Sequence, residues 1–247
     1  MTTYQHDTIV PFKDSAQSKK KQVEEMFDKI AFRYDFLNHF LSAGIDIGWR
    51  KKTLRQLVSL HPKNILDVAT GTGDMAILAC RILQPEKVTG IDLSDGMLEI
   101  GYRKIEKLGL QHRIELLKGD SETIMFGADS FDAVTVAFGV RNFEDLEQGL
   151  SEIKRVLRPG GRLAILECTK PKIPIIKNFY NFYLNVMAPL IGRVISKNKN
   201  AYRYLNESVQ KFPEGKDFVE ILKKLGYKNA SCKPLSLGIS TIYWAEK

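Results

Sequence analysis

The chain has 247 residues, of which 44% are hydrophobic, and its formal net charge is +8. This length and apolar content are enough for one well-buried α/β core with some inserted segments. The three cysteines, Cys80, Cys168 and Cys232, are few and far apart, which argues against a disulfide framework or a zinc site and fits a reducing cytosol.

The basic balance predicts an anionic partner, and charge alone leaves nucleic acid, an anionic membrane surface and a phosphate-rich ligand open. Residues 1–10 are polar and lack the apolar stretch of a secretion signal. No segment reaches the roughly 18 apolar residues that a bilayer-spanning helix needs. We therefore expect a cytoplasmic protein that is soluble or lies on a membrane surface.

The first predicted elements are helical. Residues 1–20 are polar and basic, which predicts a flexible basic arm. From Val23 to Tyr34 the apolar residues recur at steps of three and four, which indicates an amphipathic helix. A second helix is expected from Trp49 to about Leu60. Together these helices would make residues 21–62 a helical cap.

Strands and helices then alternate. Short apolar runs predict strands at residues 64–68, 87–93, 113–118, 131–137 and 162–168. Helices are expected between them, at residues 75–83, at residues 94–108 with Ser94 as the cap, and from Asp145 to a stop at Pro159-Gly160-Gly161. This alternation is typical of right-handed βαβ units and a mostly parallel sheet.

The alternation breaks after Thr169, and residues 170–212 are expected to form a helical insertion. A helix at residues 216–225 follows, and then β-like runs at 228–235 and 239–246, whose short connection predicts antiparallel neighbours. The predicted fold class is α/β: a doubly wound, mostly parallel, seven-stranded Rossmann-like sheet. We expect one domain over residues 21–247.

A glycine-containing loop follows the first predicted strand, in the sequence Asp67-Val68-Ala69-Thr70-Gly71-Thr72-Gly73-Asp74. Ligands bind at the carboxyl ends of strands in such sheets, and glycines let the backbone approach them closely. With Ala76, the two glycines also fit the dinucleotide fingerprint G-x-G-x-x-G/A, which is weak evidence by itself.

Aspartates end three successive predicted strands. Asp67 is suited to the ammonium of a methionine moiety, Asp92 to a ribose, and Asp120 to the amino group of an adenine. A pyrophosphate would be repelled by Asp67 and Asp74, whereas a sulfonium cation would be attracted. Charge therefore favours S-adenosylmethionine over NAD, although each acid taken alone is as readily a cap or turn residue.

Three motifs carry a resemblance to a known family. They are Tyr34-Asp35-Phe36-Leu37-Asn38 with Leu41-Ser42 and Trp49-Arg50, then Phe138-Gly139-Val140-Arg141-Asn142, then Arg155-Val156-Leu157-Arg158-Pro159-Gly160-Gly161 with Leu166-Glu167. From about residue 20, the chain resembles the class I S-adenosylmethionine-dependent C-methyltransferases of demethylmenaquinone and ubiquinone biosynthesis. The first two motifs are the specific ones. The sequence departs from the family at Asp46, usually His, and at Ala137, Ser in some members, with milder changes at Arg158 and Thr169.

The resemblance implies C-methylation of demethylmenaquinol to menaquinol, and leaves a ubiquinol precursor open as a further substrate. It implies that Thr72, Asp92, Asp120 and Ser121 contact the cofactor, beside Asp67, Gly71 and Gly73. The alternatives are a methyltransferase for another hydrophobic small molecule, such as a sterol or fatty acyl chain, or a non-catalytic nucleotide- or RNA-binding module.

The chemistry asks for a group that stabilises a phenolate, because loss of a phenolic proton makes the quinol ring carbon reactive. Arg141 is the candidate: it stays charged, so it can stabilise the phenolate while a water takes the proton. The alternative is an ion pair with Glu144 or Asp145 at a helix start. Further candidates are the lid residues Tyr34 and Asp35 for catalysis and Asn38 and Asn142 for substrate binding, with plain packing as the alternative for Tyr34.

Between Glu167 and Glu207 the sequence contains no acidic residue. Seven basic residues lie there: Lys170, Lys172, Lys177, Arg193, Lys197, Lys199 and Arg203. Apolar residues are interleaved at mainly helical spacing, which suits docking on an anionic bilayer at the inner face of the cell membrane. A lipid-tailed quinol would enter there. The alternative is a lid helix packed on the domain; no RNA-binding module is recognised, so nucleic acid is not expected, and the sequence leaves a homodimer open.

Overall fold

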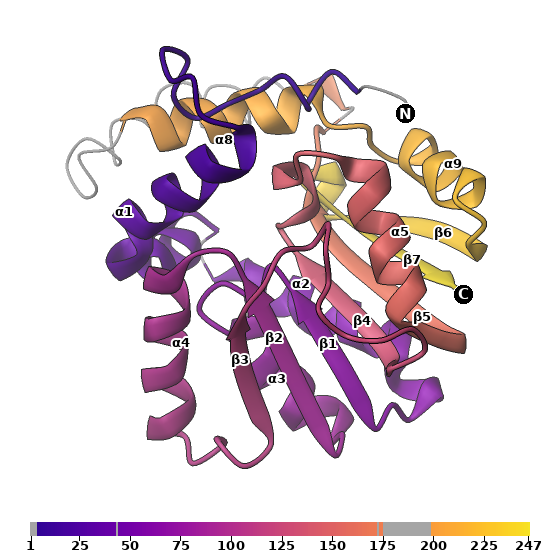
Figure 1. The fold of residues 1–247 in the computed structure, drawn as a ribbon. Helices are drawn as coiled ribbons and strands as arrows, with labels where there is room; N and C mark the ends of the chain where they lie inside the picture. The colour runs from indigo at the N-terminus through magenta and orange to yellow at the C-terminus, as the bar shows by residue number, and fades with distance from the viewer. Residues whose placement is uncertain (1–3, 43, 172, 175–198) are drawn as a thin grey trace.

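The computed structural model describes residues 4–42, 44–171, 173–174 and 199–247, without the side chains of residues 36–41, 199 and 202. Seven strands form one sheet in the order β3-β2-β1-β4-β5-β7-β6 (Figure 1). They are β1 (Asn64–Val68), β2 (Lys87–Asp92), β3 (Ile114–Lys118), β4 (Phe131–Ala137), β5 (Leu157–Cys168), β6 (Lys228–Leu235) and β7 (Ser240–Glu246). Strand β7 runs antiparallel to both of its neighbours, and the other pairings are parallel. The predicted fold class is confirmed.

Strand β5 begins earlier than predicted. The preceding helix, α5 (Leu146–Val156), ends before the Pro-Gly-Gly sequence, and Leu157 already pairs with Phe131 of β4. Gly160 has a left-handed φ of 76°, and a Cβ at Gly161 would lie 2.9 Å from the carbonyl oxygen of Asp132. The glycines therefore shape an irregular start of a strand rather than the stop of a helix.

Helices cover both faces of the sheet (Figure 1). One face carries α2 (Ile45–Leu54), the 3-10 helix η1 (Arg55–Leu60), α3 (Asp74–Leu83) and α4 (Asp95–Lys107). The other face carries α5 and α9 (Lys216–Lys224). The predicted cap at Ser94 is confirmed, since its hydroxyl accepts a hydrogen bond from the amide of Met97. The second predicted helix is two elements, α2 and η1.

Two further helices lie over the carboxyl edge of the sheet. Helix α1 (Lys19–Leu41) and helix α8 (Lys199–Lys211) share a small core that includes Val23, Met26 and Tyr204. Helix α1 also approaches the start of α4, where Asp28 accepts hydrogen bonds from the Ser94 hydroxyl at 2.6 Å and the Gly96 amide at 3.0 Å. These contacts make α1 and α8 a cap over the strand ends (Figure 1).

The N-terminal segment packs against this cap, which differs from the free arm predicted for residues 1–20. The Tyr4 hydroxyl donates to Glu147 at 2.7 Å, and Arg203 donates to the Pro11 carbonyl at 2.9 Å. His6 is fully buried, with its ring edge-on to Phe212. The sequence did not predict these contacts, because the segment is polar and its few apolar residues have no helical or strand periodicity.

Most of the predicted insertion lies outside the described residues, including its apolar face from Ile176 to Val194. Helix α8 makes up most of its described part. Among the helices that the structure describes, none is long and apolar enough to cross a membrane.

Candidate active site

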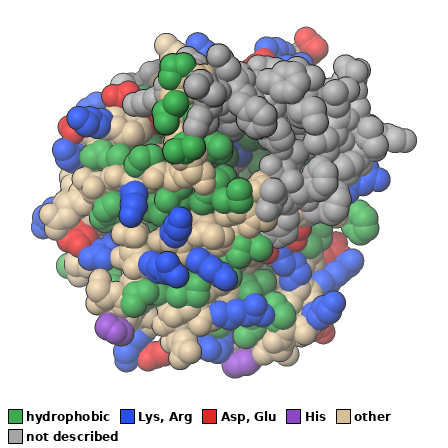
Figure 2. Space-filling model, turned by 180° about the vertical axis from the view of Figure 1, so that it is seen from behind, with side chains coloured by type: hydrophobic (Ala, Val, Ile, Leu, Met, Phe, Trp, Pro, Cys, Tyr) green, Lys and Arg blue, Asp and Glu red, His purple; other side chains and the backbone are tan. Residues whose placement is uncertain are grey.

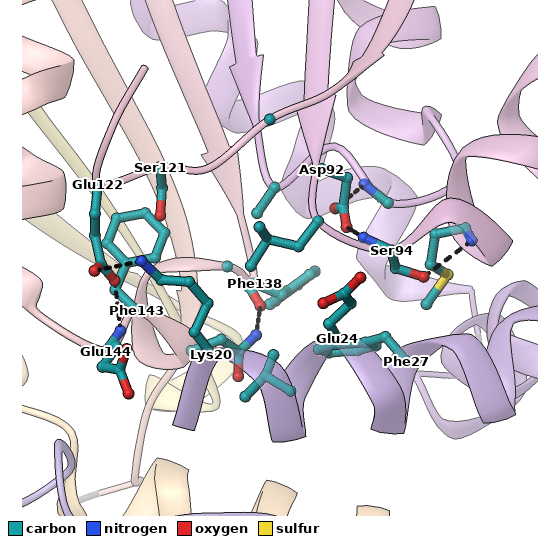
Figure 3. A pocket seen from close by; sticks show the side chains of 18 of the residues that line it. Lys20, Glu24, Phe27, Asp92, Ser94, Ser121, Glu122, Phe138, Phe143 and Glu144 are labelled. Carbon is teal, nitrogen blue, oxygen red and sulfur yellow. Dashed lines mark hydrogen bonds and ion pairs between the residues drawn. The ribbon is translucent and has the colours of Figure 1, made fainter. Parts of the chain in front are cut away.

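A pocket of about 670 Å³, its open mouth included, lies at the carboxyl edge of the sheet. The segments after β1, β2, β3 and β4 form its inner wall, and α1 forms the facing wall (Figure 3). Its wall residues include Ala69, Gly71, Asp92, Leu93, Ser94, Met97, Gly119, Ser121, Phe138 and Gly139. The pocket therefore occupies the place where ligands bind in open α/β sheets.

One side of α1 faces this pocket. Lys20, Val23, Glu24, Phe27 and Tyr34 all line it, at spacings that put them on one side of a helix. Figure 3 shows Lys20, Glu24 and Phe27 reaching from α1 toward the strand ends. The periodicity that predicted this helix thus reflects a binding surface as well as core packing.

The turns after β1 and β4 touch each other. Ala69 and Phe138 have φ values of 52° and 59°, a left-handed conformation that is rare for a bulky residue. A Cβ at Gly139 would lie 2.7 Å from the Cβ of Ala69, so only glycine fits there. Strained residues of this kind cluster at functional sites, and both line the pocket.

The glycine loop and Asp92 form one hydrogen-bonded unit. Gly71 and Gly73 have left-handed φ values of 57° and 79°. The Gly71 amide donates to one oxygen of Asp92 at 2.8 Å, and the Ser94 amide donates to the other at 2.9 Å. Burial raises the pKa of Asp92, and these backbone hydrogen bonds offset part of the rise. Asp92 thus presents a fixed carboxylate to the pocket.

Asp67 does not line the pocket, which corrects its predicted contact with an ammonium group. Its side chain is fully buried, and its two oxygens accept hydrogen bonds from Thr70 and Thr135, each at 2.6 Å. Burial raises the pKa of Asp67 to about 6, although both hydroxyls act in the opposite direction. Asp67 therefore ties the loop after β1 to the neighbouring strand β4.

Asp120 is also engaged within the protein, where the sequence predicted an open adenine contact. Its Oδ2 lies 2.6 Å from Lys20 Nζ, and its Oδ1 accepts from the Glu122 amide. Lys20 Nζ is also 2.9 Å from a carboxylate oxygen of Glu122 (Figure 3). The neighbouring Ser121 lines the pocket. Asp120 therefore stands behind Lys20, at the side of the pocket.

Asp35, Thr72 and Asp74 meet at Lys104 of α4 rather than in the pocket. Lys104 Nζ lies 2.9 Å from Asp35 and 3.1 Å from Thr72 Oγ1, and it also forms an ion pair with Asp74. The Thr72 hydroxyl in turn donates to Asp35. Asp35 thus fastens α1 to the glycine loop, and Asp74, which was expected to repel a pyrophosphate, is paired with Lys104, whose charge it shares with Asp35.

Other carboxylates give the pocket its charge. Glu24, Asp92, Glu122 and Glu144 line it, against Lys20 as the one lysine among its described wall residues. Counted over these lining side chains, the wall is net negative, which favours a cationic ligand over a diphosphate, and Glu24 is also paired with Lys21 and Lys118, which do not line the pocket. The predicted preference holds, although Asp67 and Asp74 are not its source.

Arg141 lies beside the pocket in 3-10 helix η2 (Val140–Asn142) and is 6% exposed. Its Nη1 donates to the Phe138 carbonyl at 2.6 Å and to Glu167 at 2.5 Å. Glu144 and Asp145, the alternative ion-pair partners expected for Arg141, have other contacts: Glu144 accepts from the Lys19 amide, and Asp145 caps α5. Burial would lower the pKa of Arg141, but the negative charge of Glu167 raises it above the ordinary value.

One edge of the Arg141 guanidinium makes no hydrogen bond to the described residues. Its Nε is buried and has no hydrogen-bond partner among the described residues. Because Nη1 carries both contacts, the free donors are on the Nε and Nη2 side, the two-donor fork that matches a carboxylate or phenolate oxygen. Tyr34, a pocket residue, lies close enough to Arg141 to influence its pKa.

Asn142 lines the pocket next to Arg141. Its Nδ2 donates weakly to the Phe138 carbonyl at 3.4 Å, and its Oδ1 accepts from the Tyr204 hydroxyl at 3.1 Å. The side chain of Asn38, the other predicted substrate contact, lies outside the described residues.

The pocket gathers part of the predicted site. Of the predicted residues, its described wall contains Tyr34, Gly71, Asp92, Ser121 and Asn142, and it does not contain Asp35, Asp67, Thr72, Gly73, Asp120 and Arg141. Sequence reasoning missed Lys20, Lys104, Glu122 and Tyr204. Lys20 alone had a usable signal, because it continues the helical spacing of Val23 and Phe27.

Comparisons with known proteins agree with this geometry. The model of the ubiE/COQ5 methyltransferase family matches residues 15–247. The chain is 44% identical to a demethylmenaquinone methyltransferase from Bacteroides fragilis, over 99% of each chain. It is also 44% identical to a ubiquinone/menaquinone biosynthesis C-methyltransferase from Geotalea daltonii, over 93% of this chain and 97% of that one. A solved SAM-dependent methyltransferase from Thermotoga maritima has the same fold, with a TM-score of 0.63 at 15% identity, covering 91% of this chain and 99% of that one.

Proposed function

Because the chain belongs to the ubiE/COQ5 methyltransferase family, we propose that it transfers the methyl group of S-adenosylmethionine to a ring carbon of demethylmenaquinol, which yields menaquinol. The fold and the family agree that the protein is an S-adenosylmethionine-dependent methyltransferase. The observation that carries the proposed chemistry is the unpartnered buried edge of Arg141 beside a negatively lined pocket.

The pocket residues fit S-adenosylmethionine in charge and in shape. Asp92 would hold the ribose hydroxyls, because a carboxylate that accepts one backbone amide on each oxygen can accept further donors. Gly71 would lie against the ligand: nothing lies within 4 Å of the position of a Cβ there. The carboxylates of Glu24, Glu122 and Glu144 would attract the sulfonium charge.

When bound, S-adenosylmethionine supplies an electrophilic methyl group. The residues of the pocket would hold the quinol so that its ring carbon lies in line with that methyl, at about 3–3.5 Å. Tyr34, on α1, would help to close the pocket over both ligands. Asp35 would hold α1 in place through its ion pair with Lys104 of α4. We assign it no part in proton transfer.

Arg141 would stabilise the quinol oxygen as it loses its proton. A buried donor without an acceptor is costly, and an anionic oxygen on the free Nε–Nη2 edge would satisfy it. The guanidinium itself is a poor base, since it stays protonated, so a water molecule would take the proton. After methyl transfer the ring carbon loses its own hydrogen as a proton and the oxygen is protonated again, which restores the aromatic quinol. Glu167 would keep Arg141 in place by holding its opposite edge.

The lipid tail of the quinol suggests where the protein works. We propose peripheral contact with an anionic membrane at the inner face of the cell membrane, through the basic insertion and the surface of α2 and η1. On α2 and η1, Ile45, Ile47 and Val58 are exposed, and the basic Lys51, Lys52 and Arg55 lie between them in the sequence. Figure 2 views the molecule from the side of these helices, where hydrophobic side chains and lysines or arginines are interspersed.

The direct test incubates the purified protein with S-adenosylmethionine and short-tailed demethylmenaquinol. The expected product is heavier by one methylene unit, and Arg141→Ala should lower the single-turnover rate by far more than it weakens binding of the methyl donor. Methylation of a sterol or fatty acyl chain, without methylation of the quinol, would contradict the proposal. Unchanged turnover in Arg141→Ala would remove the role of the guanidinium.

A further inference from the structure

Tyr204 connects helix α8 to the wall of the pocket. Its side chain is 2% exposed, and its hydroxyl lies 3.1 Å from Oδ1 of Asn142. Arg141 and Glu167 are close enough to influence the pKa of its phenol, although burial has the largest effect and raises that pKa above its ordinary value. The phenol is therefore neutral at physiological pH, and its proton is available to the Asn142 amide.

The two hydrogen bonds of Asn142 set the orientation of its amide. The Phe138 carbonyl can only accept, so Nδ2 faces it, and the Tyr204 hydroxyl then donates to Oδ1, which places the carbonyl end of the amide toward α8. The Nδ2 end donates to the carbonyl of Phe138 at 3.4 Å, which leaves its second N–H without a partner among the described residues. Since Asn142 lines the pocket, this N–H is a donor that the amide can offer to a bound ligand.

The reverse orientation would be harmful to the reaction. A flipped amide would place its carbonyl oxygen where the N–H now lies, beside the position at which a quinol oxygen acquires negative charge. An acceptor there would repel that oxygen, whereas a donor would stabilise it together with Arg141. Without the tyrosine hydroxyl, the long hydrogen bond to the Phe138 carbonyl, at 3.4 Å, is the one described contact that holds the amide in this orientation.

We propose that Tyr204 is a positioning residue, which fixes the Asn142 amide so that its N–H faces the reacting oxygen of the substrate. This inference rests on the proposed function, because it concerns the same substrate oxygen. It also gives the insertion a part in catalysis, since the helix that follows residues 170–198 provides the side chain that orders the turn after β4.

The test compares Tyr204→Phe with Tyr227→Phe. Tyr227 is an equally buried phenol whose hydroxyl donates to the Leu150 carbonyl at 2.8 Å, within the core that packs on α5 and α9. Tyr204→Phe should lower kcat roughly three- to tenfold, the effect of one lost hydrogen bond, and leave the dissociation constant of S-adenosylmethionine unchanged. Tyr227→Phe should leave kcat unchanged.

A double-mutant cycle distinguishes positioning from a general structural effect. If Tyr204 acts through the amide, Tyr204→Phe will cause no further loss of kcat in an Asn142→Ala background. Equal losses in both backgrounds would overturn the proposal.

A second measurement is independent of turnover. In 15N-labelled protein, the side-chain amide resonances of Asn142, assigned by their absence in Asn142→Asp, should shift in Tyr204→Phe and stay in place in Tyr227→Phe. Unmoved resonances in Tyr204→Phe would overturn the positioning role. If the wild-type protein fails to methylate the quinol, the proposed function fails, and these resonances still decide whether Tyr204 orients the amide.

Discussion

Lys20 and Asp120 form an ion pair, with Nζ 2.6 Å from Oδ2, at the wall of the pocket. A hundred residues separate them in the chain, and the contact joins the start of α1 to the loop after β3. Lys20 thus places a positive charge inside a ring of carboxylates that would otherwise be more negative. Lys20 therefore repels a cationic ligand in this pocket and weakens its binding.

Replacing Lys20 should sharpen the preference for a cationic ligand. In Lys20→Met we expect the affinity for S-adenosylmethionine to rise about two- to fivefold relative to that for S-adenosylhomocysteine, because the homocysteine product lacks the sulfonium charge. Calorimetric titration of both ligands measures this ratio. Lys223→Met, which removes an exposed ion pair with Glu220 on α9, is the control. A ratio unchanged in Lys20→Met would show that the charge of the wall does not select the ligand.

The sequence was informative where local chemistry determines structure. Hydrophobic runs predicted β1 and β4 with their observed bounds, and the caps at Ser94 and Asp145 lie at the starts of the predicted helices. The start of β5 was wrong because its glycines serve an irregular strand, which pairing with β4 decides.

Some predicted site residues lie outside the pocket for a different reason. Whether an aspartate is open to a ligand depends on partners that the fold brings from afar, such as Thr135 for Asp67 and Lys20 for Asp120. Position at a strand end shows that a residue lies near the ligand, and it does not show which direction its side chain faces. Asp92, whose partners are local backbone amides, does line the pocket, and its contact with the ribose stays a prediction.

The buried pair of Arg141 and Glu167 should matter for stability. Glu167→Gln leaves the guanidinium buried without a counter-charge, and we expect a loss of roughly 3–5 kcal/mol in the free energy of unfolding. Urea denaturation measures this loss. The matched control is Glu246→Gln, which removes a partly exposed partner of Arg162 and should cost less than about 1 kcal/mol. Equal losses in the two variants would contradict the buried ion pair.

The pKa of Asp67 predicts a pH dependence of stability. Burial raises that pKa to about 6 from 3.8, so the folded state binds a proton more tightly than the unfolded state does. This stabilisation is present at low pH and is lost as the pH rises toward 6, by up to roughly 3 kcal/mol. In Asp67→Asn this contribution is absent.

The measurement is the free energy of unfolding of wild type and Asp67→Asn between pH 4 and 8. The variant should gain on the wild type as the pH rises from 4 to 6, and the difference should level off above that. The difference between the two proteins at pH 4 reports the altered hydrogen bonds with Thr70 and Thr135. A difference that stays constant over the whole range would contradict the raised pKa.

Membrane contact should depend on charge. Liposomes with anionic lipid are expected to retain the protein at low salt and release it at high salt, since ions screen the attraction. Reversing the charges of Lys51, Lys52 and Arg55 should weaken retention, and reversing Lys216, Lys223 and Lys224 on α9 should not. Equal retention on neutral liposomes would contradict the electrostatic part of the proposal.

Calorimetric titration of the wild-type protein with S-adenosylmethionine and with NAD, each up to millimolar concentration, tests the central claim most directly. That claim is that a pocket lined by carboxylates at the strand ends takes a positively charged methyl donor. We predict saturable binding of S-adenosylmethionine and none of NAD. Binding of NAD with no binding of S-adenosylmethionine would contradict the assignment of the pocket and the reaction proposed from it.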